Sequence, residues 1–318
     1  MDGADRTKTG PAPRITVIGG ANIDIVGLPN GHLRDADSNP GHVRTGAGGV
    51  ARNVAENLVQ LGAQTSLITA FGDDHFGQQL RRECEATGID VTESLQLQGV
   101  GGSLYLAILD DRGDMAVALS DMRAIDSLTS EWIVARTKAL RIADCAVLDT
   151  NVTEDVLIAA CTLAAGPVVL DTVSVHKAAR ARSVLDRLAV LRTNVLEAGA
   201  LLGRHLDPGD VLSLTAAVEE LREMGPALVY LTAGSRGVWL AEADRVSFHE
   251  APKVDVINVT GAGDAFTAGV AYAIATGLDA TAGVRLASKM AAYTLECEAT
   301  VSHAISSVSI EVDGGCPR

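Results

Sequence analysis

Short runs rich in apolar and β-branched residues alternate along the chain with stretches in which apolar residues recur at helical spacing. The short runs are typical of strands buried on both faces, and they lie at 15–18, 66–70, 146–148, 168–170, 190–191 and 228–231. Val50, Val54, Leu58 and Leu61 follow one face of a helix, and Gly62 supplies its stop. This alternation predicts an α/β fold in which helices cover both faces of a mainly parallel sheet.

One region departs from that rhythm. Residues 103–109 and 115–119 are strand-like and flank a polar turn that contains Gly113, which predicts a β-hairpin. Together with residues 23–43, the hairpin is expected to form a small antiparallel sheet that projects from the main domain. Ligands of open α/β sheets bind beyond the carboxyl ends of the strands, so a sheet placed there would be a lid that excludes water. An edge hairpin without a function is the other interpretation.

Length and charge limit the class of protein. The 318 residues, 47% of them hydrophobic, suffice for one large α/β domain or two smaller ones. The net charge of −14 argues against nucleic acid or an anionic membrane as a partner. Any phosphate site must therefore be built locally, from backbone N–H groups, a metal ion and a few basic side chains.

Targeting and redox features are few. No apolar run reaches the ~18–20 residues that span a bilayer, and residues 1–13 are polar, as expected of a flexible leader rather than a signal peptide. The five cysteines form no C-x-x-C pair, which favours a reducing cytoplasm over a disulfide framework or a zinc site.

The segment from Asn258 to Phe266 carries the clearest chemical signal. Gly261, Ala262 and Gly263 are small enough for a close backbone approach, and a helical apolar pattern follows them. A glycine-rich turn that opens a helix presents unpaired N–H groups and the positive end of the helix dipole, which suits a phosphate. Asp264 stands beside this site, where a carboxylate suits the orientation and deprotonation of a hydroxyl group. The pattern predicts a kinase site, but an N-cap aspartate is equally compatible with this segment alone.

A second glycine-rich turn spans residues 46–49 and also precedes a helix. It has neither the Lys-Ser/Thr of a P-loop nor the G-x-G-x-x-G spacing of a dinucleotide site. Gly48 and Gly49 would let a sugar touch the backbone, and Asn53 in the first helical turn would bind a diol. A tight turn with a polar cap explains the same residues.

Polar side chains after the first strand suggest a hydroxyl-binding pair. Asn22 and Asp24 are two residues apart in an extended segment, so they face the same side. Such a pair can bind vicinal hydroxyl groups, although loop polarity alone would also place them there. The turn at 37–41 would add ligand contacts from the lid or be only a turn.

Two further motifs follow predicted strands. Asn194 and Glu197 are three residues apart in the first turn of a helix, where they would hold a hydrated Mg²⁺ or simply cap the helix. The turn at 232–237 offers hydroxyls and an arginine to nucleotide phosphates, or is only a hairpin turn. Its candidate nucleotide-binding residues are Thr232, Gly234, Ser235 and Gly237.

Taken in order, the motifs at 46–53, 194–197, 232–237 and 261–264 resemble those of the ribokinase-like sugar and nucleoside kinases, the phosphofructokinase-B type. The resemblance extends from about residue 14 to 300, and its details are most similar to the pseudouridine kinase subfamily. It implies a three-layer α/β/α ribokinase-like fold with a small β-sheet lid, often a dimer contact. The implied domain is 14–305, with lid segments at about 21–46 and 98–121 and a tail at 306–318.

The resemblance also implies a reaction and roles. ATP would phosphorylate the 5′-hydroxyl of pseudouridine, with ribose or another nucleoside as the alternative substrate. By motif position, Asp264 would be the base, and the N–H groups of residues 261–263 would form the anion hole and contact the nucleotide. Asn194 and Glu197 would serve Mg²⁺, and Asn194 would also lie at the nucleotide. The ribose would contact Asn22, Asp24, Gly48, Gly49 and Asn53, while Ser38, Asn39 and Ser103 are candidates to read the base.

Departures from the family pattern carry their own expectations. Asn258-Val259 stands where relatives commonly have Asp-Thr, which puts potassium dependence in doubt. Gly199 replaces a second glutamate, and Arg192 replaces a lysine. Asp264 is expected to be fully ionised at pH 7, since the reference pKa of Asp is ~3.9. A non-enzymatic sensor on the same scaffold is disfavoured by the intact Asp264.

Overall fold

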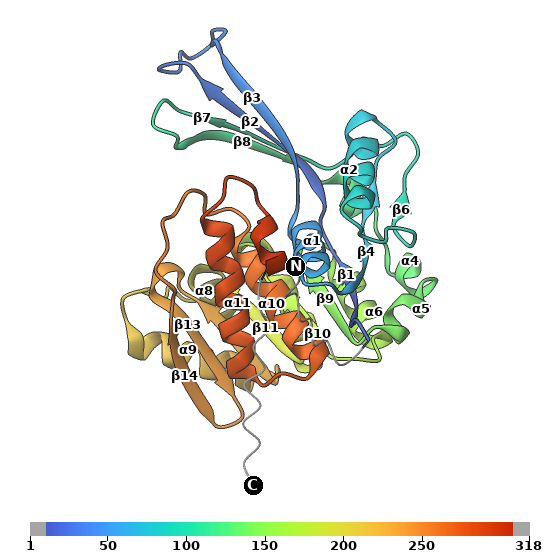
Figure 1. Cartoon of the computed structure of the whole chain (residues 1–318), viewed down its shortest axis with the longest axis vertical. Helices are drawn as coiled ribbons and strands as arrows, with labels where there is room; N and C mark the ends of the chain where they lie inside the picture. The colour runs from blue at the N-terminus through green and yellow to red at the C-terminus, as the bar shows by residue number, and fades with distance from the viewer. Residues whose placement is uncertain (1–10, 308–318) are drawn as a thin grey trace, which may run out of the picture.

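The central sheet of the computed structural model contains eight strands (Figure 1). The structure describes residues 11–307, so most of the predicted leader 1–13 and tail 306–318 lies outside the described residues. In sheet order the strands are β14 (Arg245–Glu250), β13 (Gly237–Glu242), β12 (Leu228–Thr232), β11 (Val190–Asn194), β10 (Val168–Asp171), β9 (Cys145–Asp149), β1 (Arg14–Ile18) and β4 (Gln64–Ile68). The six strands from β12 to β4 are parallel, and β13 and β14 form an antiparallel extension.

Neighbouring residues of the parallel strands enter two separate cores. Val147, Val169 and Val190 belong to one hydrophobic cluster, and the residues that follow them, Leu148, Leu170 and Leu191, belong to the other. Side chains alternate between the faces of a strand, so an uninterrupted apolar run serves a sheet that is covered on both sides. The predicted three-layer α/β/α ribokinase-like fold is confirmed.

Helices α1 (Val50–Gln60), α10 (Ala262–Thr276) and α11 (Ala280–Leu295) cover one face of the sheet. Helices α6 (Glu154–Leu163), α8 (Val195–Leu202) and α9 (Val211–Glu223) contribute to the core on the other face. The remaining helices are α2 (His75–Ala86), α3 (Arg123–Asp126), α4 (Ser130–Val134), α5 (Thr137–Ile142) and α7 (Val175–Ala178), with 3₁₀ turns η1 (Ala179–Ser183), η2 (Leu185–Arg187), η3 (Gly234–Arg236) and η4 (His303–Ser307).

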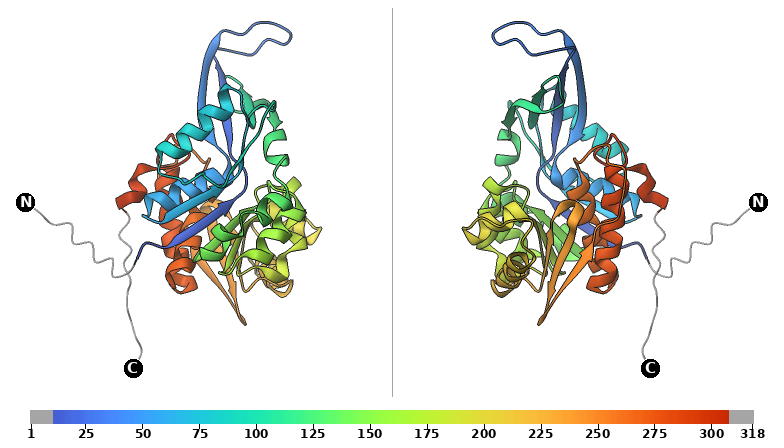
Figure 2. Two further views of the ribbon diagram at one scale, coloured as in Figure 1. Left: turned by 90° about the vertical axis from the view of Figure 1, so that its right-hand side faces the viewer. Right: turned by 90° about the vertical axis from the view of Figure 1, so that its left-hand side faces the viewer.

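A four-stranded lid sheet projects from this body (Figures 1 and 2). Its order is β3 (Gly41–Gly48), β2 (Asn22–Pro29), β7 (Leu104–Leu109) and β8 (Met115–Asp121). The expected antiparallel sheet is wrong in one respect, because β2 and β7 pair in parallel. Strands β2 and β3 form one hairpin, and β7 and β8 form the other. The chain between residues 49 and 103 joins the two hairpins, and the first strands of the hairpins, β2 and β7, lie side by side.

Most local element predictions match the structure. The helix from Val50 ends at Gln60, and Gly62 adopts a φ of 86° after the cap residue Leu61. The strand expected at 66–70 is divided: β4 ends at Ile68, and β5 (Ala70–Phe71) pairs instead with β6 (Leu95–Gln96). Among residues 11–307, no helix combines the length and apolar character needed to cross a bilayer.

Candidate active site

Several parallel strands end in a polar residue at one edge of the sheet. Strands β9, β10, β11 and β12 end at Asp149, Asp171, Asn194 and Thr232, and Gly19 follows the end of β1. The amino ends of α1 and α10 and the base of the lid meet at the same edge, since Asn53 of α1 contacts Asp264 of α10. Ligands of open α/β sheets bind at this position.

Helix α10 begins with a free set of backbone donors. Its N-cap is Gly261, whose φ of 88° favours glycine, and a Cβ there would collide with the Thr300 carbonyl. The first helical hydrogen bond runs from the Ala265 N–H to the Gly261 carbonyl at 2.9 Å. Within residues 11–307, the N–H groups of residues 261–263 have no protein partner. This arrangement fits the predicted anion hole, which stays a prediction.

Asp264 is not the N-cap of this helix, which removes the simplest non-catalytic interpretation. It lies inside the first turn, and its Oδ2 accepts a hydrogen bond from Asn53 Nδ2 at 2.7 Å. The side chain is partly buried at the junction of α10 and α1. A carboxylate beside free N–H donors can orient a hydroxyl group and receive its proton.

The expectation that Asp264 is fully ionised at pH 7 is wrong. Burial raises the pKa of Asp264 to about 7, and Asp171 adds to the increase. The hydrogen bond from Asn53 and the charge of Arg192 oppose it, while Asp149 adds a smaller increase. Desolvation of the charged form outweighs the contacts with Asn53 and Arg192. A pKa near neutrality is well matched to proton transfer at physiological pH.

Asn22 and Asp24 share one face at the base of the lid, as predicted. Asn22 Nδ2 donates to Asp24 Oδ1 at 2.6 Å, and Asn22 pairs with Gly48 across the β2–β3 ladder. Burial raises the pKa of Asp24, while Asn22 and Arg52 oppose the increase. Gly48 lies against the Asp24 carboxylate, and the carbonyl of the next residue, Gly49, accepts from the Asn53 N–H at 2.8 Å. These contacts link the five predicted ribose-binding residues.

The three candidates to read the base are not brought together. Ser38 and Asn39 lie in the loop beyond Pro29, at the outer end of the lid hairpin, and Asn39 bonds the backbone of Arg34. At about 3.3 Å per residue, the strand puts that loop roughly 20 Å from Asn22. Within one chain they do not reach the site. Ser103 is 1% exposed at the base of the lid, and its hydroxyl is buried without a hydrogen-bond partner in the described residues.

Asn194 and Glu197 form a complete capping box at the start of α8. The Asn194 side chain accepts from the Glu197 N–H at 2.9 Å, and Glu197 Oε2 accepts from the Asn194 N–H at 3.2 Å. Asn194 Nδ2 and the Thr172 hydroxyl also donate to the Glu197 carboxylate. Asn194 and Glu197 therefore cap the helix, as the alternative interpretation of this motif expects. Residues 11–307 contain no cluster of three or more His, Cys, Asp or Glu side chains able to hold a metal ion.

The turn at 232–237 is the hairpin between β12 and β13, with Thr232 paired to Val238. Gly234, Ser235 and Arg236 form η3, and Gly237 opens β13. The Thr232 hydroxyl donates to the Thr193 carbonyl at 3.3 Å and accepts from Arg192. Its position at a carboxyl strand end fits a nucleotide contact, which stays a prediction.

A charged network that local sequence patterns did not predict lies beneath the start of α10. Asp171 is 1% exposed and accepts from Thr267 of α10 at 2.6 Å and from Arg192 at 3.2 Å. A Cβ on Gly263 would lie 2.7 Å from Arg192 Nη2, so the guanidinium lies directly against the anion hole. In the sequence, the feature that could have indicated this network is an aspartate at the end of a buried strand. Both Asp171 and Asp149 have this feature.

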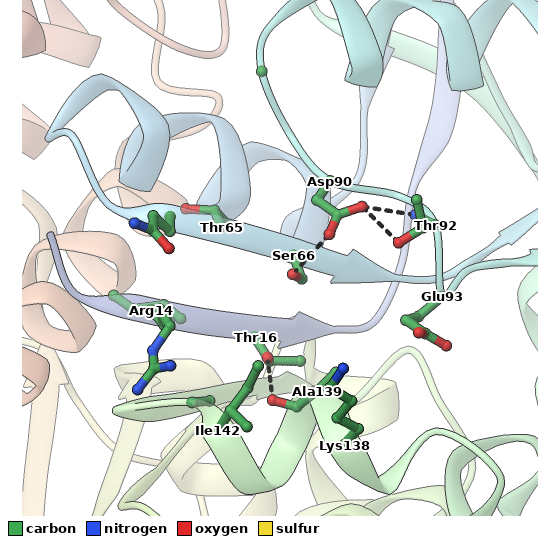
Figure 3. Close-up of a pocket in the computed structure, with 14 residues that line it drawn as sticks. Arg14, Thr16, Thr65, Ser66, Asp90, Thr92, Glu93, Lys138, Ala139 and Ile142 are labelled. Atoms are coloured by element: carbon green, nitrogen blue, oxygen red, sulfur yellow. Dashed lines mark hydrogen bonds between the residues drawn. The ribbon is translucent and has the colours of Figure 1, made fainter.

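A separate groove of about 470 Å³ lies at the opposite, amino ends of β1 and β4 (Figure 3). It includes Arg14, Thr16, Ser66, Asp90 and Lys138. The Thr16 hydroxyl bonds the Ala139 carbonyl, and the Ser66 hydroxyl bonds Asp90. The groove contains none of the predicted site residues.

The fold is ribokinase-like, and the comparison with known families identifies a phosphotransferase that acts on an alcohol group. Residues 12–306 match the model of the pfkB family carbohydrate kinases, and the chain belongs to that family. It is 36% identical to the pseudouridine kinase of Escherichia coli (strain K12) over 288 residues, which cover 90% of this chain and 91% of that protein. It is 23% identical to Bacillus subtilis (strain 168) ribokinase over 88% of this chain and 92% of that protein.

The solved structures agree on the fold. The structure of Arabidopsis thaliana ribokinase complexed with ribose and ATP superposes with a TM-score of 0.82 at 20% identity, over 93% of this chain and 98% of that one. A carbohydrate kinase from Agrobacterium tumefaciens gives a TM-score of 0.81 at 28% identity, over 93% and 96%.

Proposed function

We propose that the protein transfers the γ-phosphoryl group of ATP to the 5′-hydroxyl of pseudouridine. The observation that carries the proposal is the placement of Asp264 beside the N–H groups of residues 261–263, which have no protein partner within residues 11–307. The 36% identity to a pseudouridine kinase over nine-tenths of both chains supports the choice of substrate. Another nucleoside or ribose in the same site is the alternative.

Asp264 acts as the base in this mechanism. The substrate hydroxyl lies between the carboxylate and the γ-phosphorus, gives its proton to Asp264 and forms the new O–P bond as the bond to ADP breaks. The N–H groups of residues 261–263 stabilise the charge on the transferred phosphoryl oxygens, and Arg192 adds positive charge behind them. Phosphoryl transfer needs positioning and charge neutralisation more than covalent chemistry.

Mg²⁺ would accompany the ATP. It prefers phosphate and water oxygens with one or two protein carboxylates. Both oxygens of Glu197 and both ends of the Asn194 amide already have hydrogen bonds within the protein, so these residues would contact the ion through bound water rather than directly. Bound there, the ion would neutralise charge on the nucleotide phosphates.

The substrate assignment is tested with a panel of pseudouridine, uridine, adenosine and ribose, scored by ADP release. We expect pseudouridine to give the highest kcat/KM. A site that pairs the additional ring N–H of pseudouridine would reject uridine by about 10⁴-fold, because a buried acceptor would otherwise stay unpaired. Ribose or adenosine outpacing pseudouridine would overturn the substrate assignment and leave the kinase assignment in place.

We also propose that the chain forms a homodimer through the lid. Val43, Val117 and Leu119 lie on one lid face by strand register and are 69%, 55% and 67% exposed. A second copy of the chain would cover this apolar face. Light scattering should give a dimer mass for the wild type and a monomer mass for Leu119→Lys. A monomeric wild type at micromolar concentration would contradict the proposal.

A further inference from the structure

Arg52 is a buried arginine that no step of the mechanism above uses. It lies in the first turn of α1 and is 6% exposed. Its Nη1 donates to the Ala47 carbonyl at 3.1 Å and to Asn53 Oδ1 at 3.0 Å. Its Nη2 forms an ion pair with Glu56, one helical turn further on and also 6% exposed. The guanidinium therefore joins the end of lid strand β3 to the helix that carries Asn53.

The polarity of these bonds fixes the Asn53 side chain. A guanidinium can only donate hydrogen bonds, whereas an amide has one accepting end and one donating end. Because the oxygen of the Asn53 amide faces Arg52, its NH₂ group faces Asp264 and donates to Oδ2 at 2.7 Å. With the amide reversed, its oxygen would face the carboxylate and repel it.

We propose that Arg52 is a positioning residue for phosphoryl transfer, which holds the Asn53 amide toward Asp264 and links that orientation to the base of the lid at Ala47. The inference deepens the proposed function, because it rests on Asp264 as the base. Arg52 itself does not touch the reacting atoms.

The orientation of the Asn53 amide affects the pKa of Asp264, because other nearby charges act on the same carboxylate. Asp171 of β10 and Asp149 of β9 disfavour the ionised carboxylate, and Arg192 of β11 favours it. On α1, Glu56 balances the charge of Arg52, so Arg52 acts on Asp264 through the Asn53 hydrogen bond. Loss of that bond leaves burial and two neighbouring carboxylates opposed by Arg192 alone, and the pKa of Asp264 then rises further.

The test uses Arg52→Met together with Glu56→Met, because removing only one partner would leave a buried charge unpaired. With the best acceptor of the substrate panel, we expect the rise of kcat/KM with pH to move up by about one pH unit and kcat at pH 7 to fall about fivefold. The KM for ATP should be unchanged. Arg136→Met is the matched control, since Arg136 stacks on Trp132 away from the site.

Two further measurements separate a positioning role from a structural one. In an Asn53→Ala background, the Arg52 and Glu56 substitutions should add no further pH shift, because their effect passes through Asn53. A ¹³C-carboxylate NMR titration of Asp264 should show the same upward pKa change without any turnover. A lower melting temperature with an unmoved pH profile and an unmoved NMR pKa would overturn the proposal. A wild type with no kinase activity, or an active Asp264→Asn variant, would instead overturn the proposed function.

Discussion

The two glycine-rich helix starts look alike in sequence but differ in what their backbone donors contact. Both helices have a glycine N-cap with positive φ, 97° at Gly49 and 88° at Gly261, and a glycine has no side chain with which to cap its own helix. In α1, Asp149 accepts from the Ala51 N–H at 2.9 Å and the Gly20 carbonyl accepts from the Arg52 N–H at 3.3 Å. At α10, the corresponding donors have no protein partner within residues 11–307.

From this difference we expect an anion to bind at the start of α10 rather than at the start of α1. The dipole and donors at the start of α1 already serve the buried carboxylate of Asp149. The start of α10 keeps its donors for a ligand and places Asp264 beside them. The two starts then cooperate, because Asn53 of α1 donates to Asp264 of α10.

The largest expected loss of activity comes from Asp264 of α10, and its partner on α1, Asn53, should matter less. Asp264→Asn should reduce kcat by about 10²–10⁴-fold, because general-base assistance is lost. Asn53→Ala should cost less, since it removes only a supporting hydrogen bond. Steady-state ADP release measures both, with circular dichroism to check the fold. Near-normal turnover in a folded Asp264→Asn enzyme would refute the role of the acid.

Narrowing the vacant helix start is expected to have the next largest effect. Gly263→Ala introduces a Cβ at 2.7 Å from Arg192 Nη2, so the guanidinium must shift away from the anion hole. We expect kcat to fall by about 10–100-fold. Gly31→Ala is the control, because a Cβ there meets no atom within 4 Å. Equal activity of the two variants would show that the α10 start does not hold the phosphoryl group.

The smallest effect concerns a monovalent cation near the α10 turn. Asn258 is neutral, and both ends of its amide are occupied: Oδ1 accepts from the Thr260 N–H and Nδ2 donates to the Glu298 carbonyl. Without a carboxylate at this position, exchanging K⁺ for Na⁺ at constant ionic strength should change kcat by less than about twofold. A much larger loss of kcat in Na⁺ would indicate a cation site formed by other groups.

Local pattern was enough for most of the fold and for part of the site. The period of the apolar residues predicted β1, β9, β12 and α1, because burial dictates those residues locally. The glycine-rich pattern at 261–264 likewise predicted the turn that opens α10. The parallel pairing of β2 with β7 could not be predicted this way, since it depends on contacts between segments about 80 residues apart.

The chemistry of Asp264 was also beyond local pattern. Its pKa depends on burial and on Asp171, Arg192 and Asn53, which come from three separate elements. The same limit applies to the occupied start of α1, because Asp149 lies about 100 residues from Ala51. Reference pKa values and turn motifs describe residues one at a time, whereas the site is defined by what the fold brings together.

The pH dependence of single-turnover phosphoryl transfer tests the central claim most directly. Below pH 7, the raised pKa keeps Asp264 largely protonated and unable to accept a proton. At saturating ATP and pseudouridine, the wild-type rate should therefore rise with pH to a plateau, with the midpoint of the rise at about pH 7, and the Asp264→Asn rate should be low and flat. A flat wild-type profile, or the same rise in Asp264→Asn, would contradict the account.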